Sequence, residues 1–504
     1  MVRICITHSN CNIITQMRYS NYVKTEQIIA RGKQMKYIKK IIIYLLFIST
    51  ANAFADEPPQ SVGDLWKIIQ AQQAQIDQLN ARLETQGKSR ETEQTSPSAE
   101  NTGTASKTTT DVEEVARKTD ILGAEVEKLR TALVIPEDKQ LKSAYGLGPA
   151  ASKVYQVDKG LSIGGYGEAF YQNIVADKGD ANDNGDFLRA VLYVGYKFTD
   201  NIILNTELEF EHASTGKSGS ISLEFATLDF LMDPLANIRA GLVLIPMGFI
   251  NQIHEPNFFF GTQRPEVERR IIPSTWRENG VGLFGELIPG LTYTTYGVNG
   301  MDATGFQSSG IRGGRQSGSR VLAEDLAWVG RMDYAPPELP GLQVGGSIYL
   351  GNSGQNQVFA GQKINAFTQL YEGHIQWKYR GLEFRALGAW GHIDDADILS
   401  AANGQTIGSS NFGWYTEIGY NILPLILPET SHYLAPFFRY ERLDPLASVP
   451  NGFADVGNLD REIFQFGLQY KPIPNIVIKA DYRNFSAREG SVPDEFNLGI
   501  GYVF

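Results

Sequence analysis

Residues Leu188 to Phe198 read LRAVLYVGYKF and alternate between two kinds of side chain. Leucine, valine, tyrosine and phenylalanine fall on one face, whereas Arg189 and Lys197 fall on the other. Successive side chains of a β-strand point to opposite faces of its sheet, so this period of two predicts a strand. The next strand repeats the pattern, with apolar residues on one face and polar residues on the other: Ile202, Leu204, Leu208 and Phe210 against Asn205, Glu207, Glu209 and Glu211.

The same alternation continues to the end of the chain and predicts about sixteen strands. Their approximate spans are 161–173, 187–198, 201–212, 219–232, 236–245, 279–287, 290–298, 325–334, 341–350, 367–379, 381–392, 411–420, 433–441, 461–471, 475–484 and 494–504. Connections after even-numbered strands are mostly tight, as at Thr199-Asp200 and Ile288-Pro289, whereas those after odd-numbered strands are mostly long, polar and glycine-rich. Short periplasmic turns that alternate with long external loops, and aromatic residues at strand ends, are typical of bacterial outer-membrane barrels. The predicted fold class is therefore all-β: a transmembrane antiparallel β-barrel of about 16 strands in the outer membrane, with both termini in the periplasm.

Composition excludes several other classes of protein. No stretch after residue 60 supplies the roughly 20 consecutive apolar residues of a membrane-spanning helix. The net charge of −11 argues against a nucleic-acid partner, which would need a basic face to meet phosphates. The histidines are scattered, and His254, His374 and His392 lie in no HExxH or nucleophile-elbow context. We therefore expect no enzyme activity, no metal and no cofactor.

Residues 1–55 are predicted to be an upstream extension followed by a cleaved signal peptide that begins near Met35. A lysine-rich stretch precedes the short apolar core Ile41–Ile48, and small residues follow at Ala51, Ala53 and Ala55. A single membrane anchor is the alternative, although the apolar core is short for one. Cleavage would remove both cysteines of the chain, which excludes a disulfide framework in the mature protein.

Residues 56–140 are predicted to form a periplasmic α-helical coiled coil with a Ser/Thr-rich linker. Apolar residues recur at alternating four- and three-residue spacing from Leu65 to Leu83 and from Val112 to Leu133, which is a heptad pattern. An amphipathic helix packed on the barrel is the alternative. The tract from about Thr85 to Thr110 is almost free of apolar residues and is predicted to be flexible. Residues 141–160 are predicted to be a further linker, and 161–504 the barrel.

The last strand alternates apolar and other residues from Phe496 and ends on Phe504. This ending looks like the terminal signal by which outer-membrane proteins are handed to the barrel-assembly machinery. The expected partners are therefore that machinery and outer-membrane lipid.

The longest predicted loop, 246–278, combines apolar clusters with charged residues. Its apolar side chains, which include Phe258–Phe260 and Trp276, need burial even though the loop should lie outside the cell. We therefore expect the loop to fold into the lumen and narrow it. The predicted constriction consists of Arg264, Glu266, Glu268, Arg269, Arg270, Arg277 and Glu278.

Two short motifs flank the start of this loop, Arg239-x-Gly241 and Pro246-x-Gly248. They resemble a pattern of the phosphate-selective porin family (O and P), and the resemblance covers residues 160–504. It implies a homotrimer of 16-stranded barrels, a constriction formed by the third long loop, and anions that move along inward arginines and lysines. The heptad zone is instead similar to the N-terminal extension of some sugar porins.

The alternation along each strand also predicts which charged residues line the pore: Arg189, Lys197, Glu207, Glu209, Arg239, Arg331, Arg385, Arg439, Lys479 and Arg483. Their cations could form a path for anions by replacing part of the hydration shell. The alternative is a mixed-charge wall whose ion pairs brace the barrel, because Glu211, Glu224, Glu383 and Glu441 are also predicted to face inward.

A barrel of about 16 strands leaves an aqueous lumen, whereas small barrels fill with side chains. The sequence therefore predicts an outer-membrane porin, a water-filled channel for passive diffusion of small hydrophilic solutes or ions. A preference for anions or phosphate is a further hypothesis. The alternatives are a sugar-type porin, or an envelope tether or adhesin that uses the barrel as an anchor and reaches peptidoglycan.

Overall fold

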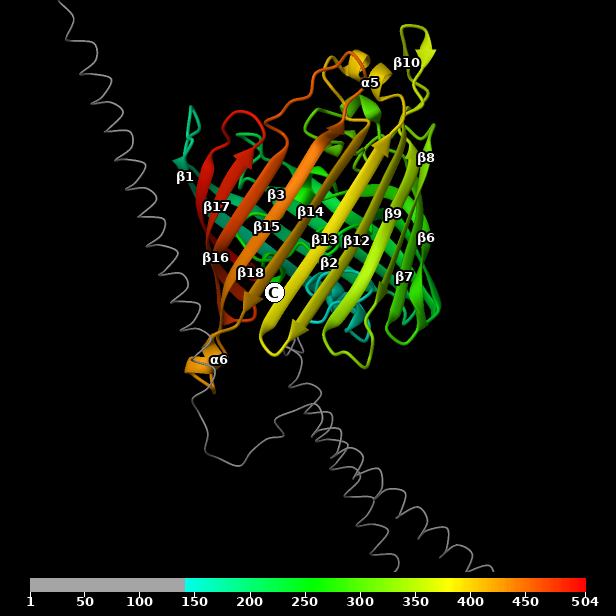
Figure 1. Cartoon of the computed structure of the whole chain (residues 1–504). Helices are drawn as coiled ribbons and strands as arrows, with labels where there is room; N and C mark the ends of the chain where they lie inside the picture. The colour runs from blue at the N-terminus through cyan, green and yellow to red at the C-terminus, as the bar shows by residue number, and fades with distance from the viewer. Residues whose placement is uncertain (1–140) are drawn as a thin grey trace, which may run out of the picture. The chain divides into compact units, whose positions relative to one another are not determined.

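The computed structural model describes residues 141–504, in which sixteen antiparallel strands close into one barrel (Figure 1). The strands are β1 (Gly160–Ala176), β2 (Asn184–Lys197), β3 (Ile202–Glu211), β4 (Ile221–Asp233), β5 (Ala236–Leu244), β6 (Arg277–Ile288), β7 (Leu291–Asn299), β8 (Leu326–Tyr334), β9 (Leu342–Asn352), β12 (Phe367–Tyr379), β13 (Leu382–Ile393), β14 (Ser410–Tyr420), β15 (Tyr433–Ser448), β16 (Arg461–Ile473), β17 (Ile476–Ala487) and β18 (Asp494–Val503). A separate small sheet pairs β10 (Val358–Phe359) with β11 (Gln362–Lys363). The signal peptide and coiled coil predicted for residues before 141 lie outside the described residues.

The predicted fold class is confirmed, since each of the sixteen expected strands is present. Their bounds lie within three residues of the predicted ones, except that β15 extends seven residues further, to Ser448. First and last strands close the cylinder: β1 pairs with β18 in the register Tyr166 to Val503. The final residue completes this seam, because Phe504 N donates to Gly165 O at 2.8 Å and Phe504 O accepts from Gly165 N at 2.9 Å. A closed barrel leaves no unpaired sheet edge.

The outer face of the barrel is apolar and its inner face is polar. Phe466 is 54% exposed on the outside, whereas its neighbour Gln465 points inward and is completely buried. Exposed aromatic side chains lie toward both ends of the strands, at Tyr171, Tyr196, Trp377, Trp390, Trp414, Tyr420 and Tyr502. An apolar band between two aromatic girdles is the surface that a transmembrane barrel presents to lipid.

The two ends of the barrel differ in how their strands are joined. At one, named here the turn end, connections are as short as 234–235, 289–290 and 380–381, and the longest of them, 421–432, contains α6 (Leu423–Ile426). At the other, named the loop end, connections include 245–276, 300–325 and 394–409, the last with α5 (Ala396–Asn403). Tight and long connections alternate along the chain, as the sequence predicts. In bacterial barrels the tight turns face the periplasm. None of the helices within 141–504 is long and apolar enough to cross a membrane.

Two segments pack inside the barrel. The first is the connection between β5 and β6, residues 245–276, named here the inner loop, which contains η3 (Pro256–Phe258) and α4 (Glu266–Arg270). The second, residues 141–156, is named here the N-terminal segment and contains η2 (Ala151–Tyr155). This second finding corrects the linker predicted for 141–160. Its buried side chains pack with inward residues of β1, β2 and β4 in one cluster, a tertiary arrangement that local composition does not reveal.

Candidate functional site

The inner loop crosses the barrel and contacts strands on opposite sides of it. Arg331 of β8 donates to Gly248 O at 2.5 Å. Lys479 of β17, on the other side of the closed strand order, donates to Phe259 O at 3.0 Å and Gly261 O at 2.8 Å. The inner loop therefore lies within the lumen, and its role as a constriction remains a prediction.

Apolar packing explains why this loop folds inward. Trp276 is completely buried and its ring lies 4.7 Å from that of Tyr349 on β9. Met247, Ile272 and Val267 are buried in the same core cluster. The predicted loop boundary is corrected: Arg277 and Glu278 are the first residues of β6, because pairing with β5 extends to Leu244 opposite Arg277.

The arginines predicted to line the pore do face inward, but carboxylates neutralise them. Arg189 lies 2.9 Å from both Glu168 and Glu209. Arg239 lies 2.7 Å from Asp229 on the neighbouring strand. The remaining wall arginines are paired in the same way: Arg331 with Asp333, Arg385 and Arg439 with Glu417, and Arg483 with Glu266 and Glu495.

The other predicted wall residues are also engaged. Lys479 lies over the Phe259 ring at 3.8 Å in addition to its two carbonyl contacts. Lys197, near the turn end, donates to Val157 O at 3.0 Å. Glu207 Oε1 lies 3.1 Å from His254 Nε2 of the inner loop. The geometry favours the mixed-charge wall over a free cationic ladder, since each of these inward charges has a partner and little contact with solvent.

Within the inner loop, two buried glutamates differ in their surroundings. Burial would raise the pKa of Glu266, but Arg269, Arg483 and Arg270 outweigh it and hold that pKa below its ordinary value. Glu268 instead accepts hydrogen bonds from Tyr415 Oη at 2.6 Å and from a main-chain N–H. Burial raises the pKa of Glu268 to about 7. The first carboxyl is therefore an anion, whereas the second is near its titration midpoint at neutral pH.

Five arginines near the loop end form no ion pair with a carboxylate of the described part of the chain. Arg320 is exposed and Arg461 lies at the start of β16. The other three, Arg264, Arg312 and Arg315, are half-buried in the inner loop and in connection 300–325. Arg264 Nη1 lies 3.5 Å from Thr275 Oγ1, and Arg315 donates to the carbonyl of the same threonine. The two side chains therefore converge on one residue of the inner loop. Burial lowers the pKa of Arg312 to about 9, and the like charges of Arg315, Arg269 and Arg264 add to this effect. Buried N–H groups of Arg264 (Nε) and Arg312 (Nη1) have no hydrogen-bond acceptor among residues 141–504.

The predicted constriction residues differ in their contacts. Arg264 lacks a carboxylate partner, and Arg269, with 45% of its side chain exposed, lies only 3.5 Å from Glu266. Arg270 is paired with Glu266 at 2.6 Å. Arg277 is held by Glu224 at 2.6 Å, and Glu278 accepts from Asn299 at 2.6 Å. Sequence reasoning missed Arg312 and Arg315; the signal that points to them is the run Arg-Gly-Gly-Arg at 312–315 in the connection between β7 and β8.

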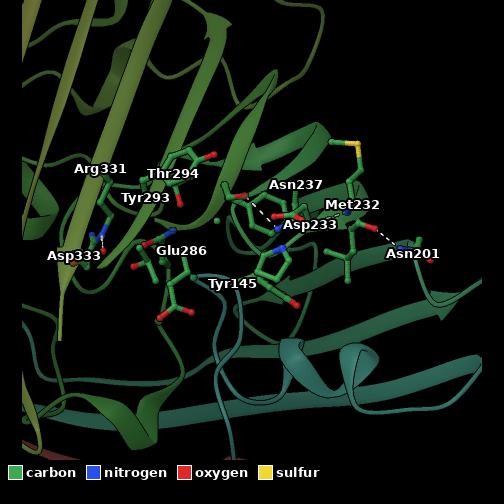
Figure 2. A pocket seen from close by; sticks show the side chains of 17 residues that line it. Tyr145, Asn201, Met232, Asp233, Asn237, Glu286, Tyr293, Thr294, Arg331 and Asp333 are labelled. Atoms are coloured by element: carbon green, nitrogen blue, oxygen red, sulfur yellow. Dashed lines mark hydrogen bonds and ion pairs between the residues drawn. The ribbon is translucent and has the colours of Figure 1, made fainter. Parts of the chain in front are cut away.

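A cavity of about 460 Å³ opens at the turn end (Figure 2). Its lining includes Tyr145 of the N-terminal segment on one side and Glu286, Thr294 and Arg331 of the barrel wall on the other. Arg331 is paired with Asp333 at 2.6 Å inside it. The lining therefore offers polar groups of both signs, which suits water and hydrophilic solutes.

Comparison with solved structures gives remote likenesses to an outer membrane protein, an outer membrane channel and a porin. The loop L8 deletion mutant of OmpT, an outer membrane protein of Vibrio cholerae, is 12% identical, with a TM-score of 0.46 over 69% of this chain and 100% of that one. The outer membrane channel DcaP of Acinetobacter baumannii is 14% identical, with a TM-score of 0.46 over 68% and 97%. An anion-selective porin from Comamonas acidovorans is 12% identical, with a TM-score of 0.43 over 68% and 99%. No family model matches the sequence.

One relative is similar in sequence over most of its length. It is an uncharacterized protein of Aquifex aeolicus (strain VF5), 38% identical over 392 residues, which are 75% of this chain and 87% of the relative. An identity this high over so much of both sequences means that the chain belongs to the same protein family as this Aquifex aeolicus protein.

Proposed function

We propose that the protein is an outer-membrane porin through which small hydrophilic solutes diffuse passively. The observation that carries this proposal is the contrast between the two faces of the closed 16-stranded barrel. Its outside is apolar and its inside holds ion pairs, polar side chains and a cavity with charged side chains in its lining. A barrel that served only as an anchor would not need this size, because smaller barrels fill with side chains and leave no lumen.

The proposed route passes the inner loop rather than the strand wall. Arg385 and Arg439 are buried beneath the inner loop, since they donate to Phe258 O and Phe260 O at 2.6 Å each. A solute that enters from the loop end would therefore meet the surface of this loop and of connection 300–325. The turn-end cavity would be the other end of the route.

A modest preference for anions follows from the same geometry. Each wall arginine named above is paired with a carboxylate, whereas Arg264, Arg312 and Arg315 have no carboxylate partner within residues 141–504. A unit charge acts more strongly in a confined and partly desolvated site than in bulk water. We therefore place the ion preference at these three arginines and not at the wall. Specificity for phosphate, which the family resemblance implies, would require the same arginines.

The proposal extends to assembly. The barrel would be a homotrimer in the outer membrane, inserted by the barrel-assembly machinery through its last strand and Phe504. Cross-linking of the protein in its native membrane, followed by electrophoresis, would test the trimer directly.

Channel activity is tested by inserting the purified full chain into planar lipid bilayers. We expect stepwise increases in current, with a conductance that rises with salt concentration, and a reversal potential in a KCl gradient that favours chloride modestly. The same preparation should migrate differently on gels before and after boiling, which shows that the barrel is folded. A folded barrel that gives no current steps would instead support the tether or adhesin.

A further inference from the structure

The N-terminal segment fills part of the lumen at the turn end. It is the cyan stretch that lies among the strands near the tight turns in Figure 1. Val154 and Ala151 are buried against the wall, at 1% and 3% exposure. The segment also contacts the inner loop, because Ala150 N donates to Glu255 Oε1 at 3.0 Å.

Polar anchors hold this segment to three neighbouring strands. Tyr155 Oη donates to Asp229 on β4 at 2.7 Å and accepts from Arg239 on β5 at 3.2 Å. Asn205 on β3 donates to Ala151 O at 2.8 Å. Arg239 thus joins a wall ion pair to the segment, which fixes the position of the Tyr155 ring.

Glycines in the wall make room for the segment. A side chain at Gly195 of β2 would come within 2.6 Å of Val154, and one at Gly164 of β1 would come within 2.6 Å of Ala150 O. Real Cβ atoms do not approach so closely. These two inward positions therefore accept the segment because they lack a Cβ.

Side chains, and not strand pairing, tie the segment to the barrel. Its hydrogen bonds between main-chain groups close local turns, as from Ser152 N to Gly148 O at 2.9 Å, and it pairs with none of the sixteen barrel strands. The glutamate that links it to the inner loop is incompletely hydrogen-bonded, because Glu255 Oε2 is buried without a partner among the described residues. Burial raises the pKa of Glu255 to about 8. A packed segment with side-chain anchors and no strand pairing is easier to release than a strand of the barrel.

The segment does not fill the whole of this end of the barrel. The turn-end cavity remains beside it, and its lining includes Tyr145 and Gly146. The Tyr145 ring packs 5.3 Å from Phe284 of β6, so the segment reaches across to that wall. The segment therefore forms part of the boundary of this cavity.

We propose that residues 141–156 form a displaceable plug, which restricts the channel at its turn end and widens it when it withdraws. This inference rests on the proposed channel function. Withdrawal would break the contacts of Tyr155 and Ala150 and leave the barrel hydrogen bonds intact.

The test uses two variants of the full chain that displace the plug by different means. Gly195→Leu places a side chain where Val154 packs, whereas Tyr155→Ala removes the anchor to Asp229 and Arg239 without adding volume to the wall. Gly373→Leu is the control for adding a leucine to a strand, because this glycine lies on the outward face and a side chain there meets nothing within 4 Å. We expect severalfold higher single-channel conductance for both displacing variants and no change for the control.

Accessibility gives a second readout that does not depend on current. A cysteine introduced as Val154→Cys should resist a bulky membrane-impermeant maleimide in the otherwise unaltered chain and react readily when combined with Tyr155→Ala. If both displacing variants have the same conductance as the unaltered chain, and Val154→Cys already reacts without Tyr155→Ala, the plug is refuted and the channel stands. If neither the unaltered chain nor any variant conducts although all fold, both proposals fail. A silent unaltered chain with conducting variants would support the plug.

Discussion

Arg439 and Glu417 lie opposite each other on β15 and β14, and Nε and Nη2 of the arginine donate to the same carboxylate oxygen at 2.9 and 2.8 Å. Nη2 also donates to Phe260 O of the inner loop. The guanidinium therefore joins the wall to the loop and is not available to a passing anion. Glu417 also lies 3.3 Å from Arg385, so it is the nearest carboxylate to two buried arginines, although Glu441 lies 3.8 Å from Arg439.

Glu417→Gln should accordingly destabilise the barrel more than its small change in shape suggests. Breaking a buried ion pair from one side leaves uncompensated charge and costs about 3–5 kcal/mol. Urea-induced unfolding in detergent micelles would measure the loss. Glu462→Gln is the control, because Glu462 is half exposed and its contact with Arg442 is 4.0 Å. Equal stability of the two variants would show that the wall pairs do not brace the barrel.

The strands and their inner and outer faces could be predicted because both follow from local alternation. The pairing of Arg439 with Glu417 could not, since it needs the register between strands, and a shift of one residue would change every partner. Once the register is known, the pair is evident, because the two residues face each other directly.

The burial of the N-terminal segment could not be predicted from the sequence for a different reason. The segment contains Gly146, Gly148 and Pro149 among small residues, a composition that is typical of a linker. Its burial depends on wall glycines at 164 and 195, which lie outside the segment itself. The inner loop was easier to predict, because its apolar clusters required burial somewhere.

Ion preference should respond to the arginines of the loops and not to those of the wall. Arg264→Ala combined with Arg312→Ala should shift the reversal potential in a KCl gradient toward that of potassium, because both groups are half-buried and lack a carboxylate partner within residues 141–504. Planar-bilayer recordings of the double variant would measure the shift. Arg320→Ala is the control, since Arg320 lies in the same connection as Arg312 but is exposed. An unchanged reversal potential in the double variant would remove these arginines from the route.

A charged side chain on the outer face should destabilise the barrel where that face contacts hydrocarbon. Phe466→Arg near the middle of β16 should cost about 2–4 kcal/mol, because a cation at the bilayer midplane is poorly solvated. Refolding into lipid vesicles at graded denaturant concentrations would measure the cost. Glu462→Arg on the same outward face, near the loop end of β16, should be tolerated, with a cost of about 0–1 kcal/mol at the interface. A similar loss at both positions would contradict the lipid-facing assignment.

Stability should fall as pH rises from about 4.5 to about 7, because of Glu268. Burial, together with the nearby Glu372, raises the pKa of Glu268 to about 7, although the hydrogen bonds from Tyr415 and Ile250 and the charge of Arg385 oppose this. In the unfolded chain the same carboxyl has an ordinary pKa near 4.5. The folded state thus keeps a proton that the unfolded state loses, so this stabilisation is complete below pH 4.5 and is lost as pH approaches 7.

Heat-induced unfolding in detergent between pH 4.5 and pH 8 would measure this slope. Glu268→Gln should make it shallower, because the amide is neutral throughout and still accepts one of the two hydrogen bonds. Glu429→Gln, at an exposed position in the connection between β14 and β15, should leave the slope unchanged. If the Glu268→Gln protein retained the full slope, another buried carboxyl would be responsible, and Glu255 would be the first to examine, since burial raises its pKa to about 8.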